Sequence, residues 1–410
     1  MPTRGHTQGI AMFDHIPAYP GDPILSLNED FQLDPRPNKV NLSIGIYFDD
    51  AGKLPVMDAV RHAETALLGA IGPRSYLPMA GLPLYRDAAQ ALLFGANHEA
   101  RAAGRIATLQ TIGGSGALKV GADFLKRYFP ASQIWISDPS WENHRVVFEN
   151  AGLTVNTYPY YDERTGGLRF ADMIETISRL PEQSIVLLHA CCHNPTGVDL
   201  SPAQWAELVP VLQRRKLIAF VDMAYQGFGS GLEEDAACVR LLADAGVPLI
   251  AANSFSKNFS LYGERCGALS VVCKSRDEAA RVLGQLMSAV RANYSNPPTH
   301  GARLVANVLS DASLRASWEA ELATMRERIL AMRGTIHDGL AGRVDEVMRA
   351  RYVAQRGMFT YTGLSEAQVE RLRSEYAVYV LRSGRMCVAG LNARNAGYVA
   401  SSIAAVVAGA

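Results

Sequence analysis

The sequence has no excess of charge of either sign, because its 410 residues include 40 Lys and Arg and 40 Asp and Glu. A surface without net charge argues against nucleic acid or an anionic membrane as the main partner. No apolar run reaches the roughly 20 residues that span a bilayer, and no signal-peptide pattern stands at the start. We therefore expect neither a membrane partner nor a nucleic-acid partner.

Disulfide frameworks and spaced metal ligands are also missing. The six cysteines include no C-x-x-C pair, which in a chain of this size predicts reduced thiols in a cytoplasmic protein. His189 and His193 lie four positions apart around Cys191 and Cys192. We interpret this group as buried packing rather than as a metal site, and the other histidines lack the spacing of metal ligands.

The composition, with 48% hydrophobic and 20% charged residues, is that of an ordinary enzyme with a large core. Residues 1–11 are polar and patternless, and we expect a disordered extension there. Residues 12–40 are rich in proline and predict an extended arm that packs on another body, such as a partner subunit. The predicted divisions are an arm with part of a small domain (12–55), a large domain (56–325) and a small C-terminal domain (326–410).

Apolar segments of strand length alternate with helical patterns in the large domain. This alternation predicts an α/β fold with a mostly parallel sheet covered on both faces. A long amphipathic helix over 314–340 and a smaller α+β segment follow. Helices are also predicted over 55–70, 81–94, 117–127 and 201–214. The seven predicted strands are 106–111, 134–137, 153–158, 184–190, 217–221, 247–252 and 268–272.

Polar residues stand where several of these strands end. Ligands bind outside the carboxyl ends of the strands in an open parallel sheet, so these residues are candidates for a shared site. The strand 106–111 runs into Gly113-Gly114-Ser115-Gly116, which predicts a phosphate cradle at a helix start, although a plain tight turn is the alternative. Asn194-Pro195-Thr196-Gly197 follows another strand. Asp222 closes a third strand and could meet a buried cation or cap the next helix.

Lys257 follows the apolar strand 247–252 and has no carboxylate near it in sequence until Glu264. A lysine without an ion-pair partner, shielded by neighbouring aromatic rings, loses proton affinity and becomes a better nucleophile. The hydroxyl of Ser254 and the guanidinium of Arg265 could hold a phosphate nearby. A Schiff-base lysine beside a phosphate site is what pyridoxal phosphate needs, whereas an isolated Ser-x-x-Lys is more often a solvated loop.

Taken in order, these motifs resemble class I aminotransferases of the aspartate and aromatic branch. The resemblance covers residues 12 to about 408 and implies pyridoxal-phosphate fold type I, with a large, mostly parallel seven-stranded sheet domain and a smaller α+β domain. The matching stretches are Ser75-Tyr76-Leu77, Gly113-Gly114-Ser115-Gly116, Ser140-Trp141-Glu142-Asn143-His144, His193-Asn194-Pro195-Thr196-Gly197, Asp222-Met223-Ala224-Tyr225-Gln226-Gly227-Phe228, Ser254-Phe255-Ser256-Lys257-Asn258, Tyr262-Gly263-Glu264-Arg265, Arg291-Ala292-Asn293-Tyr294-Ser295-Asn296-Pro297-Pro298 and Gly384-Arg385.

The resemblance implies a role for each cofactor residue. Lys257 carries pyridoxal 5'-phosphate as a Schiff base and later moves the substrate proton. Asp222 pairs with the ring nitrogen, Asn194 and Tyr225 bond the ring hydroxyl, and Trp141 stacks on the ring. The residues implied to hold the phosphate are Gly114, Ser115, Ser254 and Arg265, with Tyr76 reaching it from the other subunit of a homodimer.

The resemblance also implies the substrate contacts. Arg385 binds the α-carboxylate as a bidentate fork, and Arg291 of a partner subunit meets a distal carboxylate. Gly45, Trp141 and Asn194 are implied to complete the substrate site, and His144 to stand behind Asp222. Amino acids and 2-oxo acids are therefore the expected small-molecule partners.

The substrate class depends on the loop after residue 45. Ile46, Phe48 and Leu54 are apolar, which is the aromatic pattern of the family, as is Ser115, whereas Asn296 follows the aspartate pattern. An apolar lining makes a phenyl ring easier to bury by about 1–3 kcal/mol. We predict an aromatic-amino-acid aminotransferase that also accepts aspartate and glutamate. The alternative is an aspartate aminotransferase with little aromatic activity.

Overall fold

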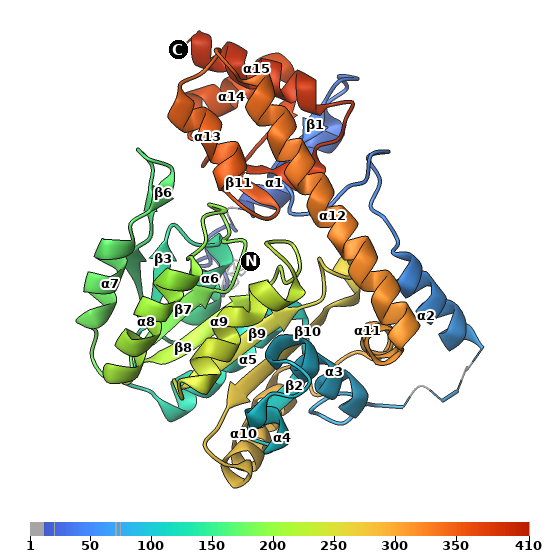
Figure 1. The fold of residues 1–410 in the computed structure, drawn as a ribbon, viewed down its shortest axis with the longest axis vertical. Helices are drawn as coiled ribbons and strands as arrows, with labels where there is room; N and C mark the ends of the chain where they lie inside the picture. Colours follow the sequence, from blue (N-terminus) through green and yellow to red (C-terminus); the bar gives the residue numbers. More distant parts are fainter. Residues whose placement is uncertain (1–11, 20, 70–71, 74, 410) are drawn as a thin grey trace, which may run out of the picture.

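The structure of the protein is a computed structural model, and it describes residues 12–19, 21–69, 72–73 and 75–409. The extension predicted for residues 1–11 lies outside these described residues. Figure 1 shows a larger body built around a sheet and a smaller body formed by the two ends of the described chain, with the long helix α12 running between them.

A seven-stranded sheet forms the centre of the larger body, in the order β2, β10, β9, β8, β7, β3, β4. Strand β10 is antiparallel to both neighbours, and the other adjacent pairs are parallel. The predicted fold class, α/β with a mostly parallel seven-stranded sheet, is confirmed. The strands are β2 (Ile106–Ile112), β3 (Ile134–Asp138), β4 (Val155–Pro159), β7 (Ile185–His189), β8 (Ile218–Met223), β9 (Leu249–Ser254) and β10 (Cys266–Val272).

Two hydrophobic cores lie on the two faces of this sheet, because successive side chains of a strand point to opposite faces. Phe220 belongs to one core and its neighbour Val221 to the other. Helices α5 (Gly113–Tyr128), α6 (Glu142–Glu149) and α10 (Arg276–Asn293) cover the Phe220 face. The helices of the other core are α3 (Pro83–Phe94), α7 (Phe170–Ser178), α8 (Pro202–Arg214) and α9 (Leu232–Asp244).

The smaller body joins segments that are far apart in sequence. Strand β1 (Val40–Asn41) pairs in parallel with β12 (Val378–Tyr379), so segments near the two ends of the described chain lie side by side. Strands β11 (Phe359–Tyr361) and β13 (Arg385–Cys387) form a second, antiparallel pair. The helices here are α1 (Pro23–Leu33), α12 (Ala312–Gly339), α13 (Glu346–Ala354), α14 (Glu366–Tyr376) and α15 (Ala396–Ala408).

The remaining elements connect these layers. Helices α2 (Asp58–Leu68) and α11 (His300–Ser310) pack against each other and against α12. Short elements complete the chain: α4 (Glu99–Ala102), the hairpin of β5 (Tyr161–Asp162) and β6 (Gly167–Leu168), and the 3₁₀ turns η1 (Tyr262–Glu264) and η2 (Val388–Gly390). Within the described residues, no helix combines the length and the apolar character needed to cross a membrane.

The prediction of an extended arm over residues 12–40 was wrong for its middle part, which is the helix α1. Asp22 accepts hydrogen bonds from the backbone N–H groups of Ile24 and Leu25, and Pro23 occupies the first helical position. The Asp-Pro pair is therefore an N-cap and N1 signal rather than a turn. Other boundaries shifted less: helix α5 begins at Gly113, four residues before the predicted start at residue 117.

Candidate active site

A cavity of about 500 Å³ opens at the carboxyl ends of β7, β8 and β9, between the sheet and the smaller body. Each of these strands has a polar or charged side chain lining the cavity at one of its last two positions, namely His189, Asp222 and Ser254. The residues that line it are Ile24, Leu25, Ile44, Gly45, Gly114, Ser115, Leu118, Trp141, His189, Cys191, Asn194, Asp222, Ala224, Tyr225, Ser254, Ser256, Lys257, Tyr262, Arg265, Phe359 and Arg385.

One end of the cavity is an anion cradle. Helix α5 begins at Gly113, whose N–H donates to the carbonyl of Arg265 at 2.9 Å. The helix has no side-chain cap, so the N–H groups of Gly114 and Ser115 point toward the cavity end as anion donors, and the helix dipole favours negative charge there. Gly113 has φ +64°, and a Cβ at this position would lie 2.6 Å from Nη2 of Arg265. A Cβ at Gly114 would touch Ser254 at 3.1 Å. The glycine loop is thus the first turn of a helix held close to Arg265 and Ser254, and not a plain tight turn.

Lys257 is the cavity's buried amine. Its Nζ lies 4.8 Å from the centroid of the Tyr225 ring. Burial lowers the pKa of Lys257 to about 8, with Asp222 opposing the shift and the charges of Arg265 and Arg385 adding to it. The lowered pKa leaves more neutral amine at physiological pH than an ordinary lysine has, which favours its action as a nucleophile and proton acceptor.

Asp222 does not cap a helix, because the next helix, α9, begins only at Leu232. Its Oδ2 lies 2.9 Å from Nε2 of His144, which is fully buried. Burial alone would raise the pKa of Asp222, but the hydrogen bond from His144 and the nearby positive charges outweigh it and lower that pKa. The group at the end of β8 is therefore a buried carboxylate, which is suited to meet a cation in the cavity.

A chain of hydrogen bonds fixes the orientation of this carboxylate. The backbone N–H of Asn194 donates to Nδ1 of His189 at 3.3 Å, so Nε2 of that ring carries the proton and faces Oγ of Ser140 at 3.4 Å. Ser140 and Nδ1 of His144 are 2.9 Å apart. Burial lowers the pKa of His189 to about 3, so its ring is neutral. The donors then run in one direction, from Asn194 through His189, Ser140 and His144 to Asp222.

Arg385 forms the other charged wall of the cavity and is only 1% exposed. Its Nη1 donates to Oδ1 of Asn194 at 3.2 Å and its Nη2 to the carbonyl of Ser43 at 2.7 Å. The guanidinium also lies over the ring of Phe359, 4.5 Å from its centroid. Its Nε is buried and has no hydrogen-bond partner among the described residues. A buried guanidinium with unused donor capacity fits a carboxylate ligand.

The structure brings most of the predicted site residues together but leaves two outside. The side chain of Tyr76 is 89% exposed, and Arg291 is exposed on α10, where it donates to Ser295. Neither residue lines the cavity of its own chain. The predicted residues that do line it are Gly45, Gly114, Ser115, Trp141, Asn194, Asp222, Tyr225, Ser254, Lys257, Arg265 and Arg385.

Sequence reasoning missed three apolar or aromatic residues that line the site. Ile24 and Leu25 come from α1, and Phe359 from β11. The helix signal Asp22-Pro23 could have identified the first two; the strand pairing that places Phe359 beside Arg385 has no local signal. Leu54, expected at the substrate loop, is 43% exposed and lines a separate small cavity, while Ile44 takes part in the main one.

The lining fits pyridoxal phosphate group by group. The anion cradle suits its phosphate, the Asp222 carboxylate suits a protonated ring nitrogen, and Trp141 offers a flat aromatic surface. Lys257 supplies an amine for its aldehyde. The fold and this cavity therefore define the chain as a pyridoxal-phosphate enzyme of fold type I.

The family aminotransferase class I and II matches residues 37–403, and the chain belongs to this family. It is 56% identical to a tyrosine aminotransferase of Klebsiella pneumoniae, over 97% of this chain and 100% of that protein. It is 50% identical to an aspartate aminotransferase of Pseudomonas aeruginosa over the same shares. An aromatic-amino-acid aminotransferase of Burkholderia pseudomallei, covalently bound to pyridoxal phosphate in its crystal structure, is 52% identical, with a TM-score of 0.94 over 97% and 100% of the two chains. The chain is a pyridoxal-phosphate-dependent transaminase.

The lowered pKa of Lys257 predicts that the free energy of unfolding of the cofactor-free protein depends on pH. Below pH 8 the folded chain must bury a charged amine, which costs roughly 3 kcal/mol because one pKa unit is worth about 1.4 kcal/mol. Between pH 8 and 10.5 the folded chain has released this proton and the unfolded chain has not, so stability rises with pH. Urea unfolding of cofactor-free wild type and Lys257→Met should show the variant more stable near pH 7, with its advantage shrinking over that window. A pH-independent difference would contradict the assignment.

Proposed function

We propose that the chain moves the amino group of tyrosine, phenylalanine and tryptophan, and of aspartate and glutamate, to a 2-oxo acid such as 2-oxoglutarate. The observation that carries this proposal is the composition of one cavity, in which the buried guanidinium of Arg385 lies beside the apolar side chains of Ile24, Leu25 and Phe359. The arginine suits the α-carboxylate common to all these substrates, and the apolar wall suits an aromatic ring. The names of the relatives, which include both tyrosine and aspartate aminotransferases, support this substrate range.

When bound, pyridoxal phosphate supplies an aldehyde that links to amino groups and a ring that withdraws electrons. In our proposal the chain's own residues do the rest. Nζ of Lys257 takes the proton from the substrate Cα and returns it one carbon away, which requires an amine that is near neutral and close to that carbon. Asp222 keeps the ring nitrogen protonated, with His144 holding the carboxylate in place. Because donor and acceptor use one site in turn, ping-pong kinetics are expected.

The remaining site residues bind and orient. The free N–H groups of Gly114 and Ser115, the hydroxyl of Ser254 and the guanidinium of Arg265 hold the phosphate. The residues assigned to the ring and its substituents are Trp141, Asn194 and Tyr225, and those assigned to the substrate are Gly45, Trp141, Asn194 and Arg385.

The proposed enzyme is a homodimer with shared sites, located in the cytoplasm. Tyr76 and Arg291 are exposed and outside the cavity of their own chain, so a role at the site requires a second subunit. Phe13, Ile16 and Tyr19 of the arm are 57–79% exposed, which suits an arm that packs on a partner. The six cysteines are free and buried, which supports a reducing compartment.

Steady-state rates with phenylalanine, tyrosine and aspartate as amino donors to 2-oxoglutarate test the substrate range. The proposal expects turnover with all three and loss of the cofactor's visible absorbance band when each donor is added alone. Aspartate turnover without phenylalanine or tyrosine turnover would favour the alternative, an aspartate aminotransferase with little aromatic activity. A band that persists with every amino acid would contradict the proposed reaction.

Arg291→Ala is expected to separate the two kinds of donor. The rate constant kcat/KM for aspartate should fall by about 10²- to 10³-fold, because truncating one partner of a buried charge pair costs 2–5 kcal/mol, whereas that for phenylalanine should change little. Arg281→Ala, on the exposed face of the same helix, is the matched control. Equal losses for both donors would mean that Arg291 is not the distal clamp.

Mixed dimers show which subunit supplies Arg291. A chain with Lys257→Ala combined with a chain with Arg291→Ala forms one site that has both Lys257 and the partner's arginine. Aspartate turnover should therefore reappear on mixing. No recovery would place Arg291 at the site of its own chain.

A further inference from the structure

Helix α1 supplies two side chains to the cavity, yet it is not held by a hydrophobic core. None of its eleven side chains, all of them described, is buried. Leu25 lines the cavity while 57% exposed, and Leu33 at the other end of the helix is 83% exposed. An isolated helix of this length is marginal in water, so contacts outside the helix must keep it formed and in place.

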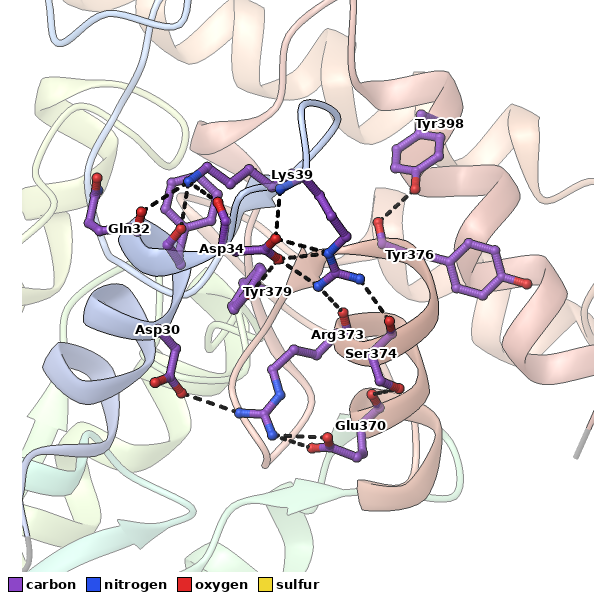
Figure 2. A network of polar contacts seen from close by, with 12 residues as sticks. Asp30, Gln32, Asp34, Lys39, Glu370, Arg373, Ser374, Tyr376, Tyr379 and Tyr398 are labelled. Atoms are coloured by element: carbon purple, nitrogen blue, oxygen red, sulfur yellow. Dashed lines mark hydrogen bonds and ion pairs between the residues drawn. The ribbon is translucent and has the colours of Figure 1, made fainter.

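Polar contacts at the C-terminal end of α1 provide this hold (Figure 2). Nζ of Lys39 donates to three backbone carbonyls, those of Phe31, Gln32 and Asp34, at 2.8, 3.2 and 2.7 Å. The last turn of α1 carries no basic residue of its own. Lys39 therefore supplies from outside the cation that the negative end of the helix dipole favours, and it satisfies carbonyls that a helix end leaves unpaired.

The same end of α1 is tied to the smaller body. Asp34, the C-cap residue, binds Nη2 of Arg36 at 2.5 Å and accepts a hydrogen bond from the hydroxyl of Tyr379 at 2.7 Å. Arg36 in turn donates to the carbonyls of Arg373 and Ser374 at the end of α14, at 2.9 and 2.7 Å. The hydrogen bonds from Arg36 hold the pKa of Asp34 well below its usual range, so the carboxylate stays charged at all physiological pH values.

We propose that Asp34, Arg36, Lys39 and Tyr379, here called the α1 clamp, are positioning residues that set the affinity for apolar substrates by fixing Ile24 and Leu25 at the cavity. None of the clamp residues lines the cavity, whereas Ile24 and Leu25 of α1 do, so α1 is the element that connects the clamp to the cavity. Because α1 is fastened at one end to β12 and α14, its two cavity residues keep a fixed place relative to Arg385, which lies on β13 of the same body. The predicted effect on substrate affinity rests on the proposed function, whereas the predicted stabilisation of α1 by the clamp does not.

The test is Lys39→Met in the cofactor-loaded enzyme, which removes the ammonium group with its charge and three donors while keeping an unbranched apolar stem. Hydrogen exchange of peptides covering residues 23–33 should become about tenfold faster, because local opening follows the lost hydrogen bonds, while peptides covering β8 should not change. The KM for phenylalanine should rise about 3- to 10-fold with kcat altered less than about twofold, since only apolar contacts to the substrate loosen. Lys39→Arg, which keeps charged donors, should restore most of both properties.

A double variant separates positioning from a general loss of structure. If Lys39 acts through Leu25, the KM of Lys39→Met with Leu25→Ala should be no higher than the larger single effect; additive effects would overturn the proposal. Lys126→Met is the matched control, because Lys126 also donates to a backbone carbonyl near a helix end, far from the cavity, and it should leave exchange and KM unchanged. Unchanged exchange over residues 23–33 in Lys39→Met would overturn the proposal even if transamination is confirmed. Faster exchange in a protein without transaminase activity would refute the proposed function alone.

Discussion

Lys257→Ala is expected to abolish transamination, with kcat falling by at least about 10⁴-fold, because in the proposed mechanism Lys257 is both the amine that carries the cofactor and the group that moves the substrate proton. Lys257 is the only lysine among the cavity residues, so no neighbouring amine can take over. The cofactor should still bind, since the anion cradle and Asp222 remain, but without a covalent link. Borohydride treatment followed by mass spectrometry should label Lys257 in the wild type and nothing in the variant.

Loss of the fold is not expected to explain this result. The amine is buried with a lowered pKa, so its removal relieves a desolvation cost rather than creating one. Lys216→Ala, which breaks an exposed pair with Glu182, is the control and should leave kcat unchanged. Cofactor fixed by borohydride to another residue, or substantial activity in Lys257→Ala, would remove the foundation of the proposed mechanism.

The sequence predicted the site best where an apolar run of strand length is followed by a polar or charged residue. The apolar run before Asp222 and the one before Lys257 predicted strands, and parallel strands place their carboxyl ends at one edge, so the joint site followed from local patterns. His144 was expected behind Asp222 because of the family resemblance, and the two side chains are 2.9 Å apart. The direction of the hydrogen bonds through Ser140 could not be predicted, since it depends on which ring nitrogen the N–H of Asn194 meets.

Apolar contacts to the cavity were harder to predict than polar ones. In the sequence, Leu25 belongs to a proline-rich segment that was predicted to be an extended arm. The helix that contains it is stabilised by Lys39 and Arg36, which lie outside the helix, so the helical sequence pattern alone is weak. Phe359 lies against Arg385 because β11 pairs with β13, and the partners in this pairing are 24 to 28 positions apart in sequence. Pattern-based reasoning treats such residues as ordinary core, and only the tertiary structure assigns them to the site.

Asp222→Asn is expected to lower kcat by about 10³-fold while keeping the shape of the site. The amide oxygen of asparagine can still accept the hydrogen bond from Nε2 of His144, so the chain of donors that begins at Asn194 stays intact. What is lost is the negative charge that, in our proposal, keeps the ring nitrogen of the cofactor protonated. The ring then withdraws electrons less well, and the proton that Lys257 must remove from the substrate becomes harder to take.

Two comparisons make this second test decisive. Asp222→Glu keeps the charge but displaces it, and it should retain more activity than the asparagine variant if charge dominates over position. His144→Ala removes the donor to Asp222. Burial then raises the pKa of that carboxyl against fewer opposing contacts, so the loss of activity should grow as the pH falls. A kcat for Asp222→Asn within about tenfold of wild type would show that the catalytic step does not need the charge. A tenfold change in rate corresponds to only about 1.4 kcal/mol of activation free energy, which is less than the loss of an essential charge should cost. The carboxylate at the end of β8 would then serve to bind the cofactor rather than to activate it.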